Sequence, residues 1–202
     1  MSNNVDDKVT GVAGKDVEMQ ESQVKSALDE TSAGYAPSEW KKVQLDEIVT
    51  STRYGASEAA ESYDPDKPRY IRIKDIDELG QLKQHEKASL SRKRADGYFL
   101  EIGDMLFARS GSVGRTYLYN PEDGECCHGG YTINHKLAGP VNRRYLHQFT
   151  KSPFYWRWIE RVAKTGAQSN INANEFGSLL IPIPPLPEQR KIASVLTTVD
   201  EA

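Results

Sequence analysis

Short segments in which apolar and polar side chains alternate follow Trp40, and they indicate strands joined by turns. The clearest is RYIRIKDI at residues 69–76, where Tyr70, Arg72 and Lys74 share one face, and Ile71, Ile73 and Asp75 lie on the other. This pattern predicts a half-buried strand with a basic and aromatic outer face.

A β-hairpin is predicted over residues 105–119. Residues 105–109 and 115–119 have strand character, and the small residues of SGSVG connect them. Such a turn leaves backbone amides open to a phosphate, and Arg109 and Arg115 flank it. An ordinary glycine turn is the alternative interpretation. The chain lacks the glycine-rich pattern ending in Lys and Ser or Thr that marks a nucleotide-binding P-loop.

Two helices are predicted after a strand at residues 129–137. Asn142 is suited to cap the first helix, and Ser152 with Pro153 suits the N-cap and first turn of the second. Apolar residues at helical spacing follow Pro153, and Gly166 is suited to end this helix. We expect most of the aromatic side chains of both helices to lie in the core.

The C-terminal residues 181–202, IPIPPLPEQRKIASVLTTVDEA, combine three kinds of local structure. The end of a strand leads into prolines at positions 182, 184, 185 and 187, each of which fixes φ and lacks an amide donor. We expect an extended, semi-rigid spacer that cannot pair inside a sheet. A helix follows, with Pro187 and Glu188 in its first turn. Its apolar stripe recurs at Ile192, Val195, Leu196 and Val199.

These patterns predict an α/β (α+β) fold: a mixed, mostly antiparallel β-sheet with packed helices, a Pro-rich arm and the start of a C-terminal spacer helix. Residues 1–39 carry eight acidic and three basic side chains and little apolar surface, which is typical of disorder. The expected organisation is a disordered acidic leader at 1–36, one folded domain at 37–180, a Pro-rich junction at 181–187 and the start of the helix at 188–202.

Composition places the chain among soluble globular proteins. Of its 202 residues, 38% are hydrophobic and 27% charged, and it contains no run of about 18 apolar residues that would indicate a membrane span. Its N-terminus is polar and acidic, unlike a signal peptide, so we expect a cytoplasmic protein. The adjacent Cys126 and Cys127 suit neither an ordinary disulfide nor a metal site, and we interpret them as reduced thiols.

The net charge of −3 conceals an uneven distribution. From Arg69 to Lys164 there are 17 Lys or Arg and 11 Asp or Glu, so the middle of the chain is basic and suited to phosphates. A solvated surface of mixed charge is the alternative. A further hypothesis is that the acidic leader mimics nucleic acid and competes for this basic face, which an unchanged DNA affinity after deletion of residues 1–34 would exclude.

The segment TGAQSNINANEF at residues 165–176 is rich in side-chain amides. Amides of Asn and Gln pair bidentately with adenine, and Arg or Lys pairs with guanine, so the segment is suited to contact base edges. Asn residues that cap a helix or bond their own backbone are the alternative interpretation. The amides belong to Gln168, Asn170, Asn172 and Asn174.

Signatures of catalysis are absent. The histidines at positions 85, 128, 135 and 147 have neither zinc-site spacing nor an HExxH pattern, and no serine lies in a GxSxG elbow. The Asn/Asp-Pro-Pro-aromatic motif with which amino-methyltransferases hold a flipped base is also missing. We therefore predict no chemistry by this polypeptide alone.

Four segments together resemble a known family and follow its order. They are PSEWKKVQLDEI at 37–48, GDMLFARSGSVGRTYLY at 103–119, TGAQSNINANEF at 165–176 and PPLPEQ at 184–189. The chain resembles the specificity subunits of type I restriction-modification enzymes over roughly residues 37–202, and the PPLPEQ junction is the most specific of the four segments.

The resemblance implies a target recognition domain that reads one half of a bipartite site in double-stranded DNA. Adenine methylation and DNA cleavage would belong to separate methyltransferase (M) and restriction (R) subunits. S-adenosylmethionine, ATP and magnesium would bind those partners, and this chain would need no cofactor of its own. A second recognition domain or half-subunit would read the other half of the site. The target sequence, the oligomeric state, and whether the chain is a half-subunit, a truncated product or a fragment stay open.

From the patterns and the resemblance we expect DNA contacts by residues of the first strand, the hairpin, the last long strand and the amide-rich segment. These residues are Arg72, Lys74, Arg109, Ser110, Gly111, Ser112, Arg115, Lys136, Lys164, Thr165, Gln168, Ser169, Asn170 and Asn172. On the spacer helix, partner contacts are expected from Gln189, Ile192, Val195, Leu196 and Val199. The alternative function is a protein-interaction adaptor that uses the Pro-rich arm and apolar helix without nucleic acid. An RNA-binding protein is a third possibility.

Overall fold

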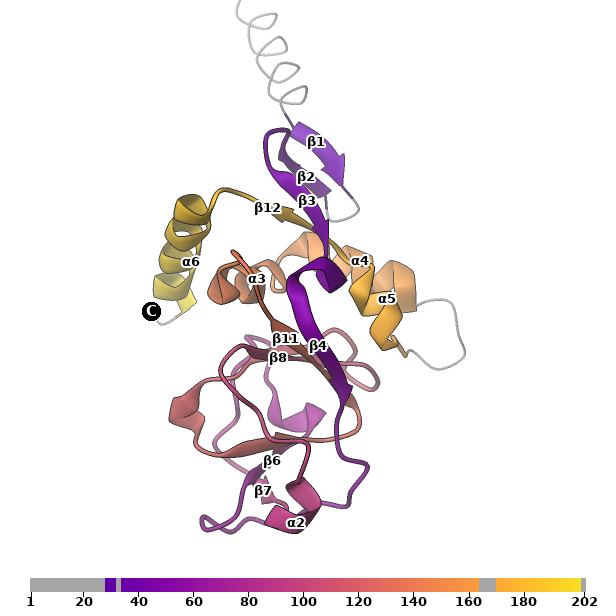
Figure 1. Cartoon of the computed structure of the whole chain (residues 1–202), viewed down its shortest axis with the longest axis vertical. Helices are drawn as coiled ribbons and strands as arrows, with labels where there is room; N and C mark the ends of the chain where they lie inside the picture. Colours follow the sequence, from indigo (N-terminus) through magenta and orange to yellow (C-terminus); the bar gives the residue numbers. More distant parts are fainter. Residues whose placement is uncertain (1–27, 32–33, 164–169, 201–202) are drawn as a thin grey trace, which may run out of the picture.

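A central antiparallel sheet divides the molecule into two layers (Figure 1). The computed structural model describes residues 28–31, 34–163 and 170–200. The sheet has the strand order β4-β11-β8-β9. Its strands are β4 Val49–Tyr54, β11 Thr132–Leu137, β8 Asp104–Ala108 and β9 Thr116–Leu118. The hairpin predicted from the SGSVG turn is confirmed as β8 and β9.

Alternate residues of β8 are buried in different cores. Met105 and Phe107 pack into the main core, whereas Leu106 packs into a second core on the opposite face. All five residues of the strand are buried. A strand covered on both faces carries apolar side chains in succession, which is why the run MLF occupies the middle of the sheet.

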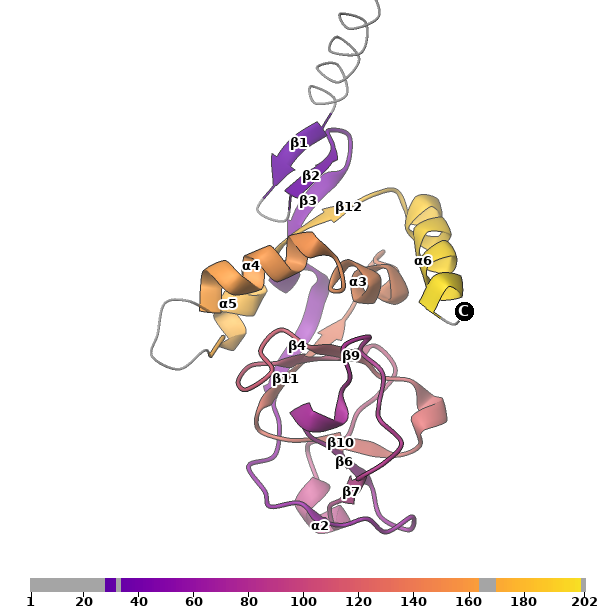
Figure 2. The same ribbon diagram turned by 180° about the vertical axis from the view of Figure 1, so that it is seen from behind.

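Three helices cover one face of the central sheet (Figures 1 and 2). They are α3 Arg143–Phe149, α4 Pro153–Ala163 and α5 Ala173–Gly177. The ring of Phe107 on the sheet lies 5.1 Å from that of Phe176 on α5, with the aromatic side chains of α4 beside them. Both predicted helices are confirmed: the Asn142 side chain accepts a hydrogen bond from the N–H of Tyr145 at 3.0 Å, and α4 begins at Pro153.

A second sheet covers the other face and has the order β10-β6-β7-β5. Its strands are β10 Cys126–His128, β6 Arg69–Ile71, β7 Ala88–Ser89 and β5 Glu61–Ser62, and the short helix α2 Arg92–Ala95 lies beside them. Strands β10 and β6 run parallel, and the other pairings are antiparallel. The described residues also contain the 3₁₀ helices η1 Leu45–Ile48, η2 Ile73–Asp75 and η3 Pro121–Asp123. The predicted mixed, mostly antiparallel α/β fold is confirmed.

The strand predicted over residues 69–76 is shorter than expected. It ends at Ile71, because the carboxylate of Asp75 accepts a hydrogen bond from the N–H of Arg72 at 2.8 Å and closes the 3₁₀ turn of η2. Tyr70 is only 4% exposed, so the predicted aromatic outer face is wrong. Alternation alone does not reveal that a second layer covers this strand.

The proline segment takes part in a sheet. Strand β12, Leu180–Ile183, pairs antiparallel with β3, Lys41–Gln44. The carbonyl of Pro182 accepts a hydrogen bond from the Tyr145 hydroxyl at 2.6 Å. The prediction that this segment cannot pair inside a sheet is therefore wrong for residues 181–183. Proline is tolerated here because each strand of a two-stranded ribbon has one edge that needs no ladder hydrogen bonds.

The C-terminal helix α6, Leu186–Asp200, begins two positions before the predicted 188 and lies beside α3 (Figures 1 and 2). Pro182 and Pro184 are buried. A PxxP-like ligand must be accessible to its partner, so burial of these prolines argues against the adaptor that would use this arm.

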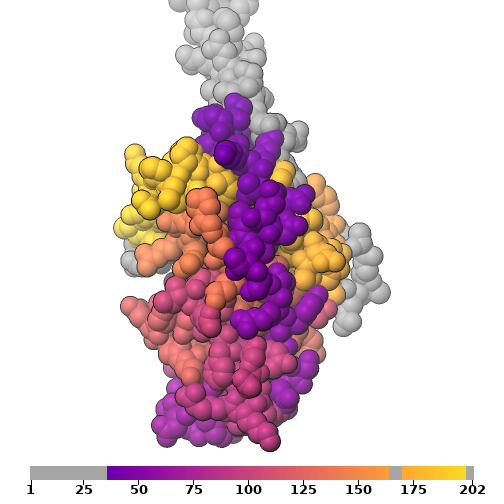
Figure 3. Space-filling model, in the orientation of Figure 1, coloured from indigo at the N-terminus to yellow at the C-terminus, as the bar shows by residue number. Residues whose placement is uncertain are grey.

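The described part of the leader contains a hairpin. Strands β1 Leu28–Thr31 and β2 Gly34–Pro37 pair antiparallel, so the prediction of disorder over residues 1–36 does not hold for them, while residues 1–27 lie outside the described part. A hairpin can form through backbone hydrogen bonds with little apolar surface, so the low apolar content of the leader did not predict β1 and β2. From β3 to β4 the chain then runs down the middle of one face, between α6 and α5 (Figure 3).

Candidate nucleic-acid interface

A groove of about 840 Å³ opens between the two layers of the molecule. Five segments line it: residues 56–60, 70–74, 109–110, 129–131 and Asn170. It gathers five of the residues predicted to contact DNA, which come from three distant parts of the sequence. They are Arg72, Lys74, Arg109, Ser110 and Asn170.

The hairpin and the amide-rich segment meet at this groove through backbone pairing. Ser110 forms an isolated antiparallel bridge with Asn170. The carbonyl of Arg109 accepts a hydrogen bond from the N–H of Ile171 at 2.9 Å, and the N–H of Arg109 donates to the carbonyl of Tyr131 at 2.9 Å. Arg109 is therefore fixed between two neighbouring chain segments.

The guanidinium of Arg109 lies over the ring of Tyr54, with its central carbon 4.8 Å from the ring centroid. The Tyr54 hydroxyl in turn accepts a hydrogen bond from the N–H of Ala173, at the start of α5, at 3.2 Å. Stacking on an aromatic face orients the guanidinium plane and leaves its donors available. Among the residues that the structure describes, the Arg109 side chain has no hydrogen bond and no ion pair.

Arg72 and Lys74 are partly neutralised. Arg72 donates hydrogen bonds to Asp75 from Nε at 2.8 Å and from Nη2 at 2.7 Å, and these bonds raise the pKa of the guanidinium. Nη2 also donates to the carbonyl of Glu86 at 2.6 Å. Lys74 pairs with the Glu86 carboxylate at 3.3 Å, and both side chains are well exposed. Sequence patterns did not predict these acidic partners.

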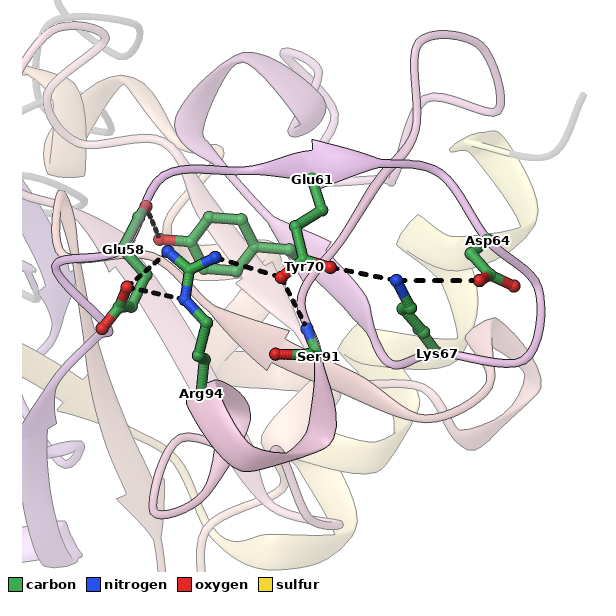
Figure 4. A network of polar contacts seen from close by, with 7 residues as sticks. All are labelled: Glu58, Glu61, Asp64, Lys67, Tyr70, Ser91 and Arg94. Carbon is green, nitrogen blue, oxygen red and sulfur yellow. Dashed lines mark hydrogen bonds and ion pairs between the residues drawn. The ribbon is translucent and has the colours of Figure 1, made fainter.

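A network of polar contacts fixes the rim of the groove at residues 56–61 (Figure 4). The buried Tyr70 hydroxyl donates to the carbonyls of Ala56 at 2.8 Å and Glu58 at 3.0 Å. Arg94 pairs with Glu58 at 2.5 Å and with Glu61 at 3.0 Å. Glu61 also accepts from Lys67, and this hydrogen bond is the main cause of its lowered pKa. Arg94 therefore balances the charge of Glu58, which lines the groove.

Glycines permit a close approach of two backbone segments at Gly129, which lines the groove. A Cβ on Gly55 would lie 2.2 Å from the carbonyl oxygen of Gly129, and one on Gly129 would lie 3.0 Å from the Tyr70 hydroxyl oxygen. Two backbone segments thus approach each other more closely than side chains permit. Beside them Tyr131 is 70% exposed. Sequence reasoning missed Tyr54, Tyr131 and this pair of glycines, although the run GGY was a usable signal.

Two predicted DNA contacts point away from the groove. Arg115 donates to the carbonyl of Ile76 at 3.0 Å and pairs with Glu78 at 3.5 Å, so its side chain is turned to a different part of the surface. Lys136 forms an ion pair with Glu101. The two arginines of the hairpin are therefore not brought to one site, because the Arg115 side chain is bound to the carbonyl of Ile76.

The remaining predicted contacts divide into three groups. Gly111 and Ser112 are exposed at the hairpin tip but do not line the groove. Asn172 is the N-cap of α5: its side chain accepts from the N–H of Glu175 at 3.0 Å, as the alternative interpretation of this asparagine expected. Four more lie outside the described residues, namely Lys164, Thr165, Gln168 and Ser169.

On α6 the predicted partner residues do not form one exposed stripe. Gln189 is 1% exposed, Ile192 is half-buried, and Val195 and Leu196 are 58% and 41% exposed. The side chain of Val199 lies outside the described part of the chain. Gln189 therefore belongs to the interior of the domain, and the exposed apolar surface of the helix is confined to its later turns.

Burial favours the neutral forms of two histidines and two cysteines. Burial lowers the pKa of His128 to about 3 and that of His135 to about 4, and it raises the pKa of Cys126 and Cys127 to about 12. Over residues 28–31, 34–163 and 170–200, His, Cys, Asp and Glu form no group that could hold a metal ion. In the same ranges no helix has the length and apolarity needed to cross a membrane.

Comparison with known proteins gives one consistent result. Residues 37–202 match the model of the type I restriction modification DNA specificity domain. The putative type I restriction enzyme MjaX specificity subunit of Methanocaldococcus jannaschii is 28% identical over 184 residues, which is 84% of this chain and 41% of that protein. The chain thus spans less than half the length of this curated relative.

Solved structures share the fold at 21% identity. The HsdS subunit from Thermoanaerobacter tengcongensis has a TM-score of 0.59 over 94% of this chain and 44% of its own, and the S subunit from M. genitalium has 0.56 over 81% and 39%. A chain from a study of assembly and conformational transition of the type I R-M system has 0.61 over 94% and 45%.

Proposed function

The chain belongs to the type I restriction-modification DNA specificity family, and we propose that its groove binds double-stranded DNA and reads one half of a bipartite site. The observation that carries this proposal is the meeting of Arg109, Ser110 and Asn170 with Lys74 in one groove. Cations and hydroxyls of this kind position a protein on phosphates, while guanidinium and amide groups can contact base edges.

The proposal assigns no chemistry to this chain. Adenine methylation and cleavage would be carried out by methyltransferase and restriction subunits, and S-adenosylmethionine, ATP and magnesium would bind there. A second recognition domain or half-subunit would read the other half of the site, since the relatives are more than twice as long as the matched region. A cytoplasmic location stays a prediction from the sequence.

Fluorescence anisotropy with a labelled duplex at several salt concentrations tests this function. Each phosphate contact releases counterions, so affinity should fall steeply as salt rises. Lys74→Ala should weaken binding to all duplexes and reduce the salt slope by about one. Lys93→Ala is the matched control, because Lys93 is exposed on α2 and does not line the groove.

Two results would contradict the proposal. The first is no binding of duplex DNA by the wild-type chain at low salt. The second is equal loss of affinity in the two lysine variants, which would indicate attraction by overall charge and not by the groove. Unlabelled RNA of the same length as competitor separates a DNA-binding from an RNA-binding protein.

A further inference from the structure

We propose that Arg109 is a specificity-determining residue that reads a guanine of the target site, with Tyr54 as its positioning residue. This inference rests on the proposed function, because it requires duplex DNA in the groove. It goes further by assigning one side chain, one base and the means by which the side chain is held.

The position of Arg109 is fixed before any ligand binds. Its N–H and carbonyl are both engaged by backbone partners, at Tyr131 and Ile171, each at 2.9 Å. Its guanidinium lies 4.8 Å from the centroid of the Tyr54 ring. The hydroxyl of that ring accepts from the N–H of Ala173, so the ring itself is tied to the start of α5. A side chain held in this way loses little conformational entropy on binding.

Arg109 differs from the other cations that line the groove because they have acidic partners. The Arg72 guanidinium is occupied by Asp75 in a two-point contact, and Lys74 is paired with Glu86. Arg109 has neither a carboxylate nor a carbonyl partner among the described residues: the residue is half-buried, and its buried Nε–H lacks an acceptor there. A partly buried donor group without a partner gains most from a ligand that supplies acceptors.

The geometry of the group identifies that ligand. A guanidinium presents two parallel N–H donors in one plane, and the major-groove edge of guanine presents two acceptors, O6 and N7, at matching spacing. A phosphate contact would need only the charge. It would not need an orientation imposed by an aromatic ring, which is why a base and not the backbone is the expected partner.

Selection of duplexes from a randomised library by the full chain, followed by sequencing, gives the preferred bases for wild type and variants. With Arg109→Ala, one G·C position should lose its preference while the others are retained. On a preferred duplex and its single G·C-to-A·T derivative, the ratio of wild-type affinities should be about 5- to 150-fold and should fall to near one in the variant. The salt slope of binding should change little.

Two further variants and a control separate the effect of the charge of Arg109 from the effects of its planar donors and of its stacking on Tyr54. Arg109→Lys keeps the charge and can still donate to guanine, but it lacks the planar pair of donors, so it should reduce the preference. Tyr54→Leu removes the aromatic support, and it should reduce the preference more than it reduces affinity for a non-preferred duplex. Arg157→Ala is the control, because Arg157 stacks on Phe154 at 4.9 Å in the same manner but does not line the groove.

The outcomes are distinguishable. If the wild-type chain binds no duplex, the proposed function fails. If it binds but selects no guanine, or if Arg109→Ala weakens all duplexes equally and lowers the salt slope, the role of Arg109 as a guanine contact is overturned while DNA binding stands. Full retention of the preference by Arg109→Lys overturns the two-donor contact. Circular dichroism of each variant confirms that it is folded.

Discussion

Gln189 and Asn142 join the start of the C-terminal helix to the recognition domain. The Gln189 side chain accepts a hydrogen bond from the N–H of Asn142 at 2.8 Å and donates one to the carbonyl of Pro184 at 2.8 Å. Because Asn142 is the N-cap of α3, one buried amide connects the proline segment, α3 and α6. The helix is thereby oriented by the domain and is not free to swing on the proline segment.

Replacing Gln189 with Ala should reduce the free energy of unfolding by about 1–3 kcal/mol, because the partly buried N–H of Asn142 and the buried carbonyl of Pro184 lose their partner. Urea unfolding followed by circular dichroism measures the change. Arg190→Ala is the matched control, since Arg190 is the exposed neighbour. Equal stability of the two variants would show that the amide does not hold the helix.

Gly114 ends the hairpin turn at a place where no side chain fits. Its φ is +88°, and a Cβ would lie 2.9 Å from Cγ1 of the buried Ile159. Gly124 has a similar φ of +78° but nothing within 4 Å of a Cβ. Gly114→Ala should therefore cost about 1–3 kcal/mol more than Gly124→Ala in thermal or urea unfolding, the difference being due to overpacking. No difference would mean that Ile159 can move without cost.

The buried histidines predict a loss of stability in mild acid. Burial lowers the pKa of His135 to about 4 and that of His128 to about 3, from an ordinary 6.5. Below pH 6.5 the unfolded chain binds more protons than the folded one, so the free energy of unfolding should fall as pH decreases from about 6.5 toward 4. Urea titrations across this range measure the slope, and His135→Gln should make it shallower. A flat profile between pH 6.5 and 5 would contradict neutral burial.

Local patterns in the sequence were sufficient for the elements that depend on local chemistry. The Asn142 cap, the Pro153 start of α4 and the small residues of the hairpin turn each determine the backbone within a few positions. The order of the strands was not predictable in this way, because it depends on which apolar faces meet. Tyr70 shows the difference: its strand alternates as if half-exposed, yet a second layer covers it.

The residue types of the candidate site were predictable from the sequence, but the directions of its side chains were not. Arg109, Ser110 and Asn170 were identifiable by residue type, and the structure brings them together through a bridge between segments far apart in the sequence. Arg115, like Arg109, is an arginine that flanks the hairpin turn, but its side chain is bound to the carbonyl of Ile76. Direction of a side chain depends on tertiary partners, and residue type does not encode it.

The most direct test of the central claim is an NMR titration of the ¹⁵N-labelled chain with duplex DNA. If the groove is the contact surface, amide signals should shift at residues 56–60, 72–74, 109–110 and 129–131, with those of α3 and α6 unchanged. Shifts centred instead on the exposed Arg143 and Arg144 of α3 and Arg190 of α6 would place the DNA on a different face and contradict the account.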